Sequence, residues 1–186
     1  MTTTDELRSG TGTTHQIGVL ADRLIGIVHA FAQPSLVQLV MRLALAVPFW
    51  RSGINKWDGF LQLKDTTVLL FNEEFMLHLP GGPYHYPAPA VFAFISGCGE
   101  ILFPILLVFG LATRFAATGL LFMTCIVELT VPDGWPVHIT WAAMALGIMA
   151  WGPGRLSLDY GIRHALGLQG RLLRRQIKQD DRTDAG

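Results

Sequence analysis

The chain has 186 residues, of which 51% are hydrophobic and only 15% are charged, and its mean hydropathy is +0.40. Soluble domains contain roughly a quarter charged residues, so this composition excludes an ordinary soluble domain and indicates a membrane protein. The formal net charge is zero, and we expect no nucleic-acid partner. The two cysteines, Cys98 and Cys125, form no Cys-x-x-Cys motif, so we predict neither a disulfide framework nor a metal site.

Residues 1–33 are predicted to form a Thr- and Gly-rich disordered start followed by an amphipathic helix. The apolar residues of this helix recur at alternating spacings of three and four, and they are Ile17, Leu20, Leu24, Ile27 and Phe31. The helix is too short and too polar to cross a bilayer, and Pro34 ends it. We expect it to lie on the membrane surface or, alternatively, against a soluble partner. The polar N-terminus has no signal-peptide pattern, and we expect no removable signal peptide.

Four later segments are predicted to span the membrane, over about 36–55, 90–110, 115–131 and 137–151. A straight helix needs about 20 apolar residues to cross the hydrocarbon core. The first span contains Arg42 and Arg51, which make it the weakest by hydropathy. The last span is short, but Trp135 and Trp151 suit the two membrane–water interfaces at its ends.

The connections between these spans predict how the helices are arranged. Residues 58–88 form one long connection with a short helix expected over 68–77, whereas 110–114 and 132–136 are tight turns. Tight turns place consecutive helices side by side in opposite directions. The predicted fold is therefore all-α: an integral membrane antiparallel four-helix bundle with flanking amphipathic interfacial helices.

Residues 34–159 form the predicted membrane domain, and residues 160–186 form a basic amphipathic tail. Seven of the fourteen basic residues follow residue 150, and they are Arg155, Arg163, Arg171, Arg174, Arg175, Lys178 and Arg182. Basic residues next to spans favour the cytoplasmic side, so we expect both termini in the cytoplasm. The tail is expected to contact an anionic membrane face.

Several ionisable residues fall inside the predicted bundle, where a charge is costly without a partner. Glu100 lies near the middle of the second span, and we expect it to pair with Arg42. Glu128 and His138 lie near the outer end, with Lys56 and Arg51 at a similar level. These ions either neutralise one another and hold the helices in register or line a proton-accessible or ligand-binding cavity. The candidate site residues are Arg42, Lys56, Glu100, Arg114, Glu128 and His138.

Heptad-like spacing predicts which face of each span is buried. In the third span the predicted inward residues are Arg114, Thr118, Leu121, Cys125 and Glu128. Cys98 and Cys125 fall at similar depths in neighbouring antiparallel spans. They are either a redox-active thiol pair or two small packing residues.

The chain resembles the DoxX family over about residues 36–160. The segments that carry the resemblance are Arg42 with Arg51-Ser-Gly-Ile-Asn-Lys56, Glu100, Gly110-Leu-Ala-Thr-Arg114-Phe-Ala-Ala, His138-x-x-Trp141 and Gly152-Pro-Gly-Arg-Leu-Ser-Leu-Asp159. Phe71-Asn-Glu-Glu-Phe75, before a proline-rich stretch, also resembles the outer segment of bacterial members. Glu128 departs from the pattern, because a neutral polar residue such as glutamine is expected there. The matching positions are Arg42, Gly53, Lys56, Glu100, Arg114, His138 and Asp159.

The resemblance implies a small four-span membrane protein. Some members are linked to thiosulfate:quinone oxidoreduction and others to membrane complexes that handle oxidative and thiol stress. We therefore expect a subunit of, or accessory to, an inner-membrane redox system, with quinone as the candidate cofactor. The expected partners are the lipid bilayer, redox-complex subunits and a second copy of the chain. The sequence has no self-sufficient catalytic motif. The alternatives are a proton-coupled transporter or channel that uses Glu100 and a scaffold whose basic tail binds partners.

Overall fold

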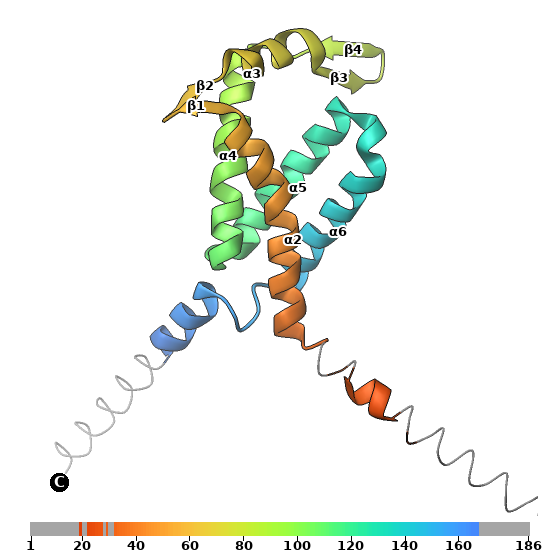
Figure 1. The fold of residues 1–186 in the computed structure, drawn as a ribbon, viewed down its shortest axis with the longest axis vertical. Helices are drawn as coiled ribbons and strands as arrows, with labels where there is room; N and C mark the ends of the chain where they lie inside the picture. The colour runs from red at the N-terminus through yellow and green to blue at the C-terminus, as the bar shows by residue number, and fades with distance from the viewer. Residues whose placement is uncertain (1–18, 20–21, 28, 30–31, 168–186) are drawn as a thin grey trace, which may run out of the picture.

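The computed structural model describes residues 19, 22–27, 29 and 32–167 (Figure 1). Four long helices dominate, and they are α2 (Pro34–Asn55), α4 (Pro89–Phe109), α5 (Thr113–Thr130) and α6 (Trp135–Trp151). These helices coincide, within a few residues, with the four predicted spans. Residues 158–167 form a further helical segment. The predicted disordered start, most of the first amphipathic helix and the tail beyond residue 167 lie outside the described residues.

Proline and glycine define the ends of the long helices. α2, α4 and α6 each have a proline in the first turn, where its missing N–H is not needed for the helical ladder. α4 ends at Gly110, whose φ of 67° is left-handed and costs glycine little. The short connection that follows lets α5 return beside α4. Pro132–Gly134 forms one 3₁₀ turn (η2) before α6.

The centre of the bundle is apolar and closely packed. α2 packs mainly against α4, and α5 packs against both α6 and α4. The buried core consists of Leu45, Ala46, Phe49, Leu107, Ala116, Ala117, Leu120, Ala145 and Ile148. α2 and α4 cross closely at Gly53, where an added Cβ would lie 2.9 Å from the backbone oxygen of Glu100. A glycine at residue 53 is therefore what brings α2 against the middle of α4.

The outer surface of the bundle is also apolar. Large hydrophobic side chains stay exposed along the outward faces of α2, α4, α5 and α6; examples are Val47, Ile95, Phe122 and Leu146. α4 and α5 are long and apolar enough, by length and composition, to cross a membrane. Among the described helices only these two meet that criterion; α2 and α6, which correspond to the first and last predicted spans, do not.

Residues 57–85 form a cap over one end of the bundle (Figure 1). Two antiparallel hairpins, β1 (Trp57–Gly59) with β2 (Gln62–Leu63) and β3 (Met76–Leu79) with β4 (Gly82–His85), flank α3 (Asp65–Leu69) and a π-helical turn, η1 (Leu70–Glu74). We call this the hairpin end, and the opposite end, where α2 begins and α6 ends, the tail end. The expectation of a helix over 68–77 was wrong beyond Glu74, and the prediction of a purely helical fold missed both hairpins.

The second hairpin has a clear local cause. Gly81 and Gly82 have φ values of 105° and 137°, which only glycine adopts readily, and they turn the chain between β3 and β4. Two side chains then join the cap to α5. The hydroxyl of Tyr86 donates to Oγ1 of Thr130 over 2.6 Å, and the ring of His78 bonds the carbonyl of Leu129 through Nδ1.

The inward face of α5 differs from the prediction by about one residue. The buried residues are Thr113, Ala116, Ala117, Leu120 and Thr124, whereas Arg114, Thr118 and Cys125 are exposed. The heptad-like spacing placed the polar residues inside. In the structure, small residues face the neighbouring helices because they allow close approach.

We expect Gly53→Ala to destabilise the bundle by about 1–3 kcal/mol, because the added methyl group overlaps the Glu100 backbone. Thermal unfolding of the purified protein in detergent measures the effect. Gly161→Ala is the matched control, since a Cβ there meets nothing within 4 Å. Equal stability of the two variants would contradict the close α2–α4 crossing.

Candidate functional site

A buried ion pair lies where α2 ends against the middle of α4. Nζ of Lys56 lies 2.5 Å from Oε2 of Glu100, and their side chains are 14% and 5% exposed. Trp57 covers the same crossing, because Gly97 of α4 leaves room for its indole ring. Removing two charges from water is expensive, so each charge depends on the other.

Two serines complete this central pair. Lys56 also donates to Oγ of Ser52 over 3.0 Å, and Ser96 donates to Oε1 of Glu100 over 3.0 Å. Each serine precedes its partner by one helical turn. We did not predict either serine as a site residue, although the spacing of four residues was visible in the sequence. The four residues together are called the central polar cluster.

The predicted pair of Arg42 with Glu100 is wrong. Arg42 lies fourteen residues before Lys56, which is about 21 Å along a helix at 1.5 Å per residue. Its Nη2 instead donates to the carbonyl of Leu156 over 2.5 Å, and the side chain lies beside Gly110 at the tail end. α2 is therefore shifted along α4 relative to the position that a pair between Arg42 and Glu100 would require.

Arg42 is fully buried, and Asp159 is the acidic residue whose charge acts on it. Nε and Nη1 of Arg42 have no hydrogen-bond partner within the part of the chain that the structure describes. Arg42 and Asp159 are both among the positions that match the family pattern, and the structure places both at the tail end. Arg114 is exposed at this same end, beside Gly152.

Asp159 caps the start of α5 from outside that helix. Its Oδ1 accepts the N–H of Ala112, and its Oδ2 accepts both the N–H and the hydroxyl of Thr113, each over 2.9 Å. Its own N–H donates to the carbonyl of Gly110 over 2.9 Å. A carboxylate is favoured at a helix N-terminus because the free N–H groups and the helix dipole are positive there.

The same contacts determine the ionisation of Asp159. Burial alone raises the pKa of this carboxyl, but the hydrogen bonds from Thr113 and Ala112 and the charge of Arg163 outweigh burial. The pKa of Asp159 therefore lies below its usual value. The carboxylate stays charged at neutral pH.

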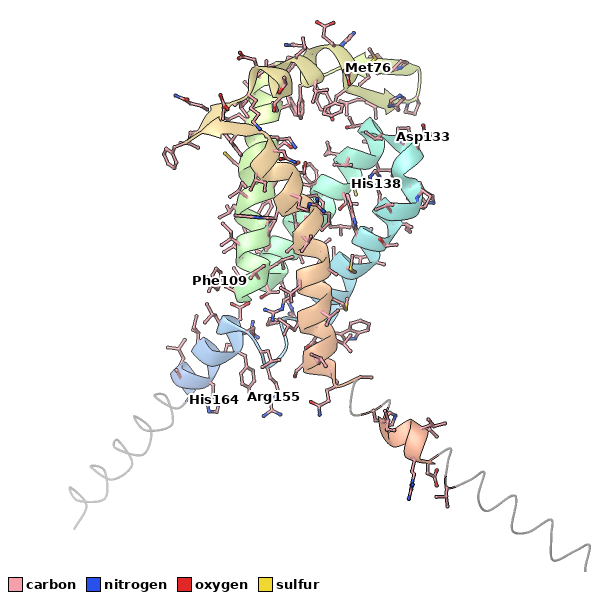
Figure 2. The ribbon with its side chains drawn as sticks, viewed as in Figure 1. Met76, Phe109, Asp133, His138, Arg155 and His164 are labelled. Atoms are coloured by element: carbon pink, nitrogen blue, oxygen red, sulfur yellow. The ribbon has the colours of Figure 1, made fainter. Side chains whose placement is uncertain are left out.

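The predicted contact between Glu128 and His138 is present, and His138 lies on the hairpin-end half of α6 (Figure 2). Nδ1 of His138 donates to Oε2 of Glu128 over 2.7 Å, since a carboxylate can only accept. The ring also packs against Trp141, whose indole packs against Phe49 of α2. Lys56 does not belong to this pair, because it is bound to Glu100, and Arg51 is exposed.

The two cysteines line different hollows of the bundle. Cys98 lines a groove between α4 and α5, whereas Cys125 lines a hollow between α5 and α6. Both thiols are free. Cys125 shares its hollow with Glu128 and His138, so that hollow contains a thiol, an imidazole and a carboxylate. The structure thus groups Cys125 with His138 more closely than with Cys98.

The groove between α4 and α5 has a volume of about 470 Å³. Its lining residues are Phe92, Ile95, Ser96, Cys98, Gly99, Leu102, Phe103, Gly119, Phe122, Met123, Ile126 and Val127. Ser96 is the polar exception among the mainly apolar and aromatic lining residues. It connects the groove to the central polar cluster through its bond to Glu100.

The model of the DoxX family matches residues 37–133, just over half of the 186-residue chain. An uncharacterised protein of Haemophilus influenzae is 28% identical over 133 residues, which cover 65% of this chain and 80% of the relative. None of the solved structures compared with the chain matches it. The range that matches the family contains the central polar cluster and the α4–α5 groove.

Removing one partner of the central pair should cost more than removing both. We expect Lys56→Met and Glu100→Leu each to lower the free energy of unfolding by about 3–5 kcal/mol, because each leaves a buried charge unpaired. The double variant should cost clearly less than the sum. Denaturant unfolding in detergent measures this cycle, with exposed Arg51→Met as control. Additive losses would show that the two charges do not depend on each other.

Asp159→Asn should destabilise the protein at neutral pH by about 2 kcal/mol, because charge-assisted hydrogen bonds to the start of α5 are weakened. Since the folded pKa of Asp159 is depressed, its stabilisation is present above the unfolded value of about 4 and is lost as the pH falls through the folded value.

Unfolding measured between neutral pH and pH 3 should therefore show less acid sensitivity in Asp159→Asn than in the natural protein. Asp133→Asn, an exposed acid on η2, is the matched control and should change neither property. Unchanged acid sensitivity in Asp159→Asn would contradict the cap.

Proposed function

Since the chain belongs to the DoxX family, a family of membrane proteins, we propose that it serves a quinone-linked redox system of the bacterial inner membrane as a subunit or accessory. The observation that carries this proposal is the contact between an apolar groove and a buried ion pair. The α4–α5 groove opens on the side of the bundle, and its Ser96 is bonded to Glu100.

The groove suits the chemistry of a lipid-soluble quinone. Its volume of about 470 Å³ falls within the range of roughly 300–1,000 Å³ that is usual for small-molecule sites. Phe92, Phe103 and Phe122 give it aromatic walls for a flat ring. Because it lies between two helices that are long and apolar enough to cross a membrane, a ligand with an apolar tail can enter from the lipid.

Ser96 supplies the polar contact that such a ligand needs. A hydroxyl has one hydrogen to donate and two positions to accept, and Ser96 uses its hydrogen on Glu100. The oxygen can therefore accept a hydrogen bond from the hydroxyl of a quinol. Glu100, which is hydrogen-bonded to Ser96, is then a buried proton acceptor, and its partner Lys56 is a buried proton donor. The redox group that exchanges electrons with the quinone would belong to a partner subunit.

A thiol-linked role is the second candidate, and the hollow between α5 and α6 favours it. His138, held by Glu128, lines the same hollow of about 300 Å³ as Cys125. An imidazole oriented by a carboxylate is suited to take a proton from a thiol, which makes the thiolate available for reaction. This site is separate from the α4–α5 groove, so variants distinguish the two roles.

Protein purified in mild detergent from bacterial membranes should retain quinone, detected by extraction and mass spectrometry. Gly99→Leu places a side chain in the α4–α5 groove and should lower the retained quinone about tenfold. Val108→Phe fills the separate hollow between α2 and α4 and is the matched control. A tenfold loss corresponds to about 1.4 kcal/mol of binding free energy.

Quinone that is absent from the natural protein, or lost equally from both variants, would contradict binding in the groove. Folding of each variant is checked by its thermal unfolding temperature. If Gly99→Leu leaves the amount of retained quinone unchanged while Cys125→Ser abolishes a thiol-dependent activity of the membrane, the second candidate replaces the first.

A further inference from the structure

An open hollow of about 690 Å³, with polar and apolar lining residues, lies at the tail end of the bundle, away from the central polar cluster and the α4–α5 groove. It is lined by the start of α2, the end of α6, the following connection and the last helical segment. Arg155 lies between α2 and that segment (Figure 2). We call this hollow the tail-end pocket, and it is lined by Gln33, Pro34, Ser35, Gln38, Trp151, Pro153, Gly154, Arg155, Tyr160 and Arg163.

The charged side chains that line the tail-end pocket are both basic. Arg155 and Arg163 line it, and no acidic side chain is among its described lining residues. Neither arginine forms an ion pair in the described part of the chain. The nearby Asp159 acts on Arg163 through its charge, but its oxygens are already bonded to Ala112 and Thr113. The two guanidinium groups are therefore available to an anion.

Neutral donors complete the lining. Oγ of Ser35 accepts the N–H of Arg155 over 3.4 Å, so its own hydrogen is free to donate. Gln38 is held in place because its amide donates to the carbonyl of Trp151 over 3.2 Å. Pro34 and Ser35 place the first turn of the 22-residue helix α2, which is its positive end, at the edge of the same space.

The expected level of the pocket relative to the membrane indicates which kind of anion it binds. Trp151 lines it and keeps 71% of its surface exposed, as tryptophan does at the level of lipid headgroups. Immediately beyond it, the exposed side chains of α2 and α6 are apolar, as Val40 and Leu146 show. A ligand bound here would have its charge at the headgroups and its apolar part along the bundle.

We propose that the tail-end pocket binds the phosphate group of an anionic phospholipid. Arg155 and Arg163 supply the charge, since guanidinium groups bind phosphate oxygens with paired hydrogen bonds. Ser35 and Tyr160 add hydroxyl donors, and Trp151 packs beside the glycerol region. The pocket thereby distinguishes anionic from zwitterionic lipids, whose ammonium group would meet two arginines.

Native mass spectrometry of the full chain, delipidated and then titrated with lipid, tests this assignment. Phosphatidylglycerol should bind about tenfold more tightly than phosphatidylcholine, and Arg155→Gln with Arg163→Gln should remove most of that preference. Arg155→Lys with Arg163→Lys should keep part of it, because the charge remains. Arg51→Gln, an exposed arginine at the end of α2 remote from this pocket, is the control for lost charge.

Three results would overturn the proposal: equal binding of the two lipids, an unchanged preference in the double glutamine variant, or an equal loss in Arg51→Gln. Glycerol phosphate, added as a soluble competitor, separates a free phosphate from a lipid. Competition at micromolar concentration would reassign the pocket to a soluble anion and overturn the lipid assignment, whereas no competition supports the lipid. Size-exclusion profiles and thermal unfolding show that each variant is folded before its binding is compared.

Discussion

The ion pair between Lys56 and Glu100 is the interaction on which the arrangement of the bundle depends. It joins the last residue before the cap to the middle of α4, and it requires α2 and α4 to touch at Gly53. That register places Arg42 level with Gly110 and directs Trp57 onto Gly97. Because an unpaired charge in an apolar bundle is costly, a displacement of α2 along α4 that separates Lys56 from Glu100 is unfavourable.

The four helices could be predicted from the sequence because their length and hydropathy are local properties. The pairing of charges could not be predicted from the sequence, because it depends on how far α2 is displaced along α4. That displacement is set by the close contact at Gly53. The inward face of α5 was predicted wrongly because Arg114 and Cys125 were assumed to be buried, whereas small residues pack inside. The β3–β4 hairpin was missed although Gly81-Gly82 is a hairpin signal, because Pro80 and Pro83 beside it argue against strands.

In the candidate site, too, some features could be predicted from the sequence and others depend on how the helices pack. Glu128 and His138 were expected together because both lie near one end of adjacent helices, and the structure brings them together. Ser96 was not predicted, although its position one turn before Glu100 was visible. Its importance depends on the groove between α4 and α5, which exists only after the helices have packed. The neutralised ion pair and the proposed ligand contact at Ser96 belong to one cluster, so the structural and functional interpretations of Glu100 need not compete.

The cap that Asp159 provides has a consequence for how the protein is made. The N–H groups at the start of α5 are bonded by a carboxylate that lies 46 residues later in the chain. During synthesis, α5 therefore emerges before the group that completes its first turn, and α6 must be made and returned to the tail end before that group arrives. The first turn of α5 can therefore be capped only after the C-terminal segment has been synthesised.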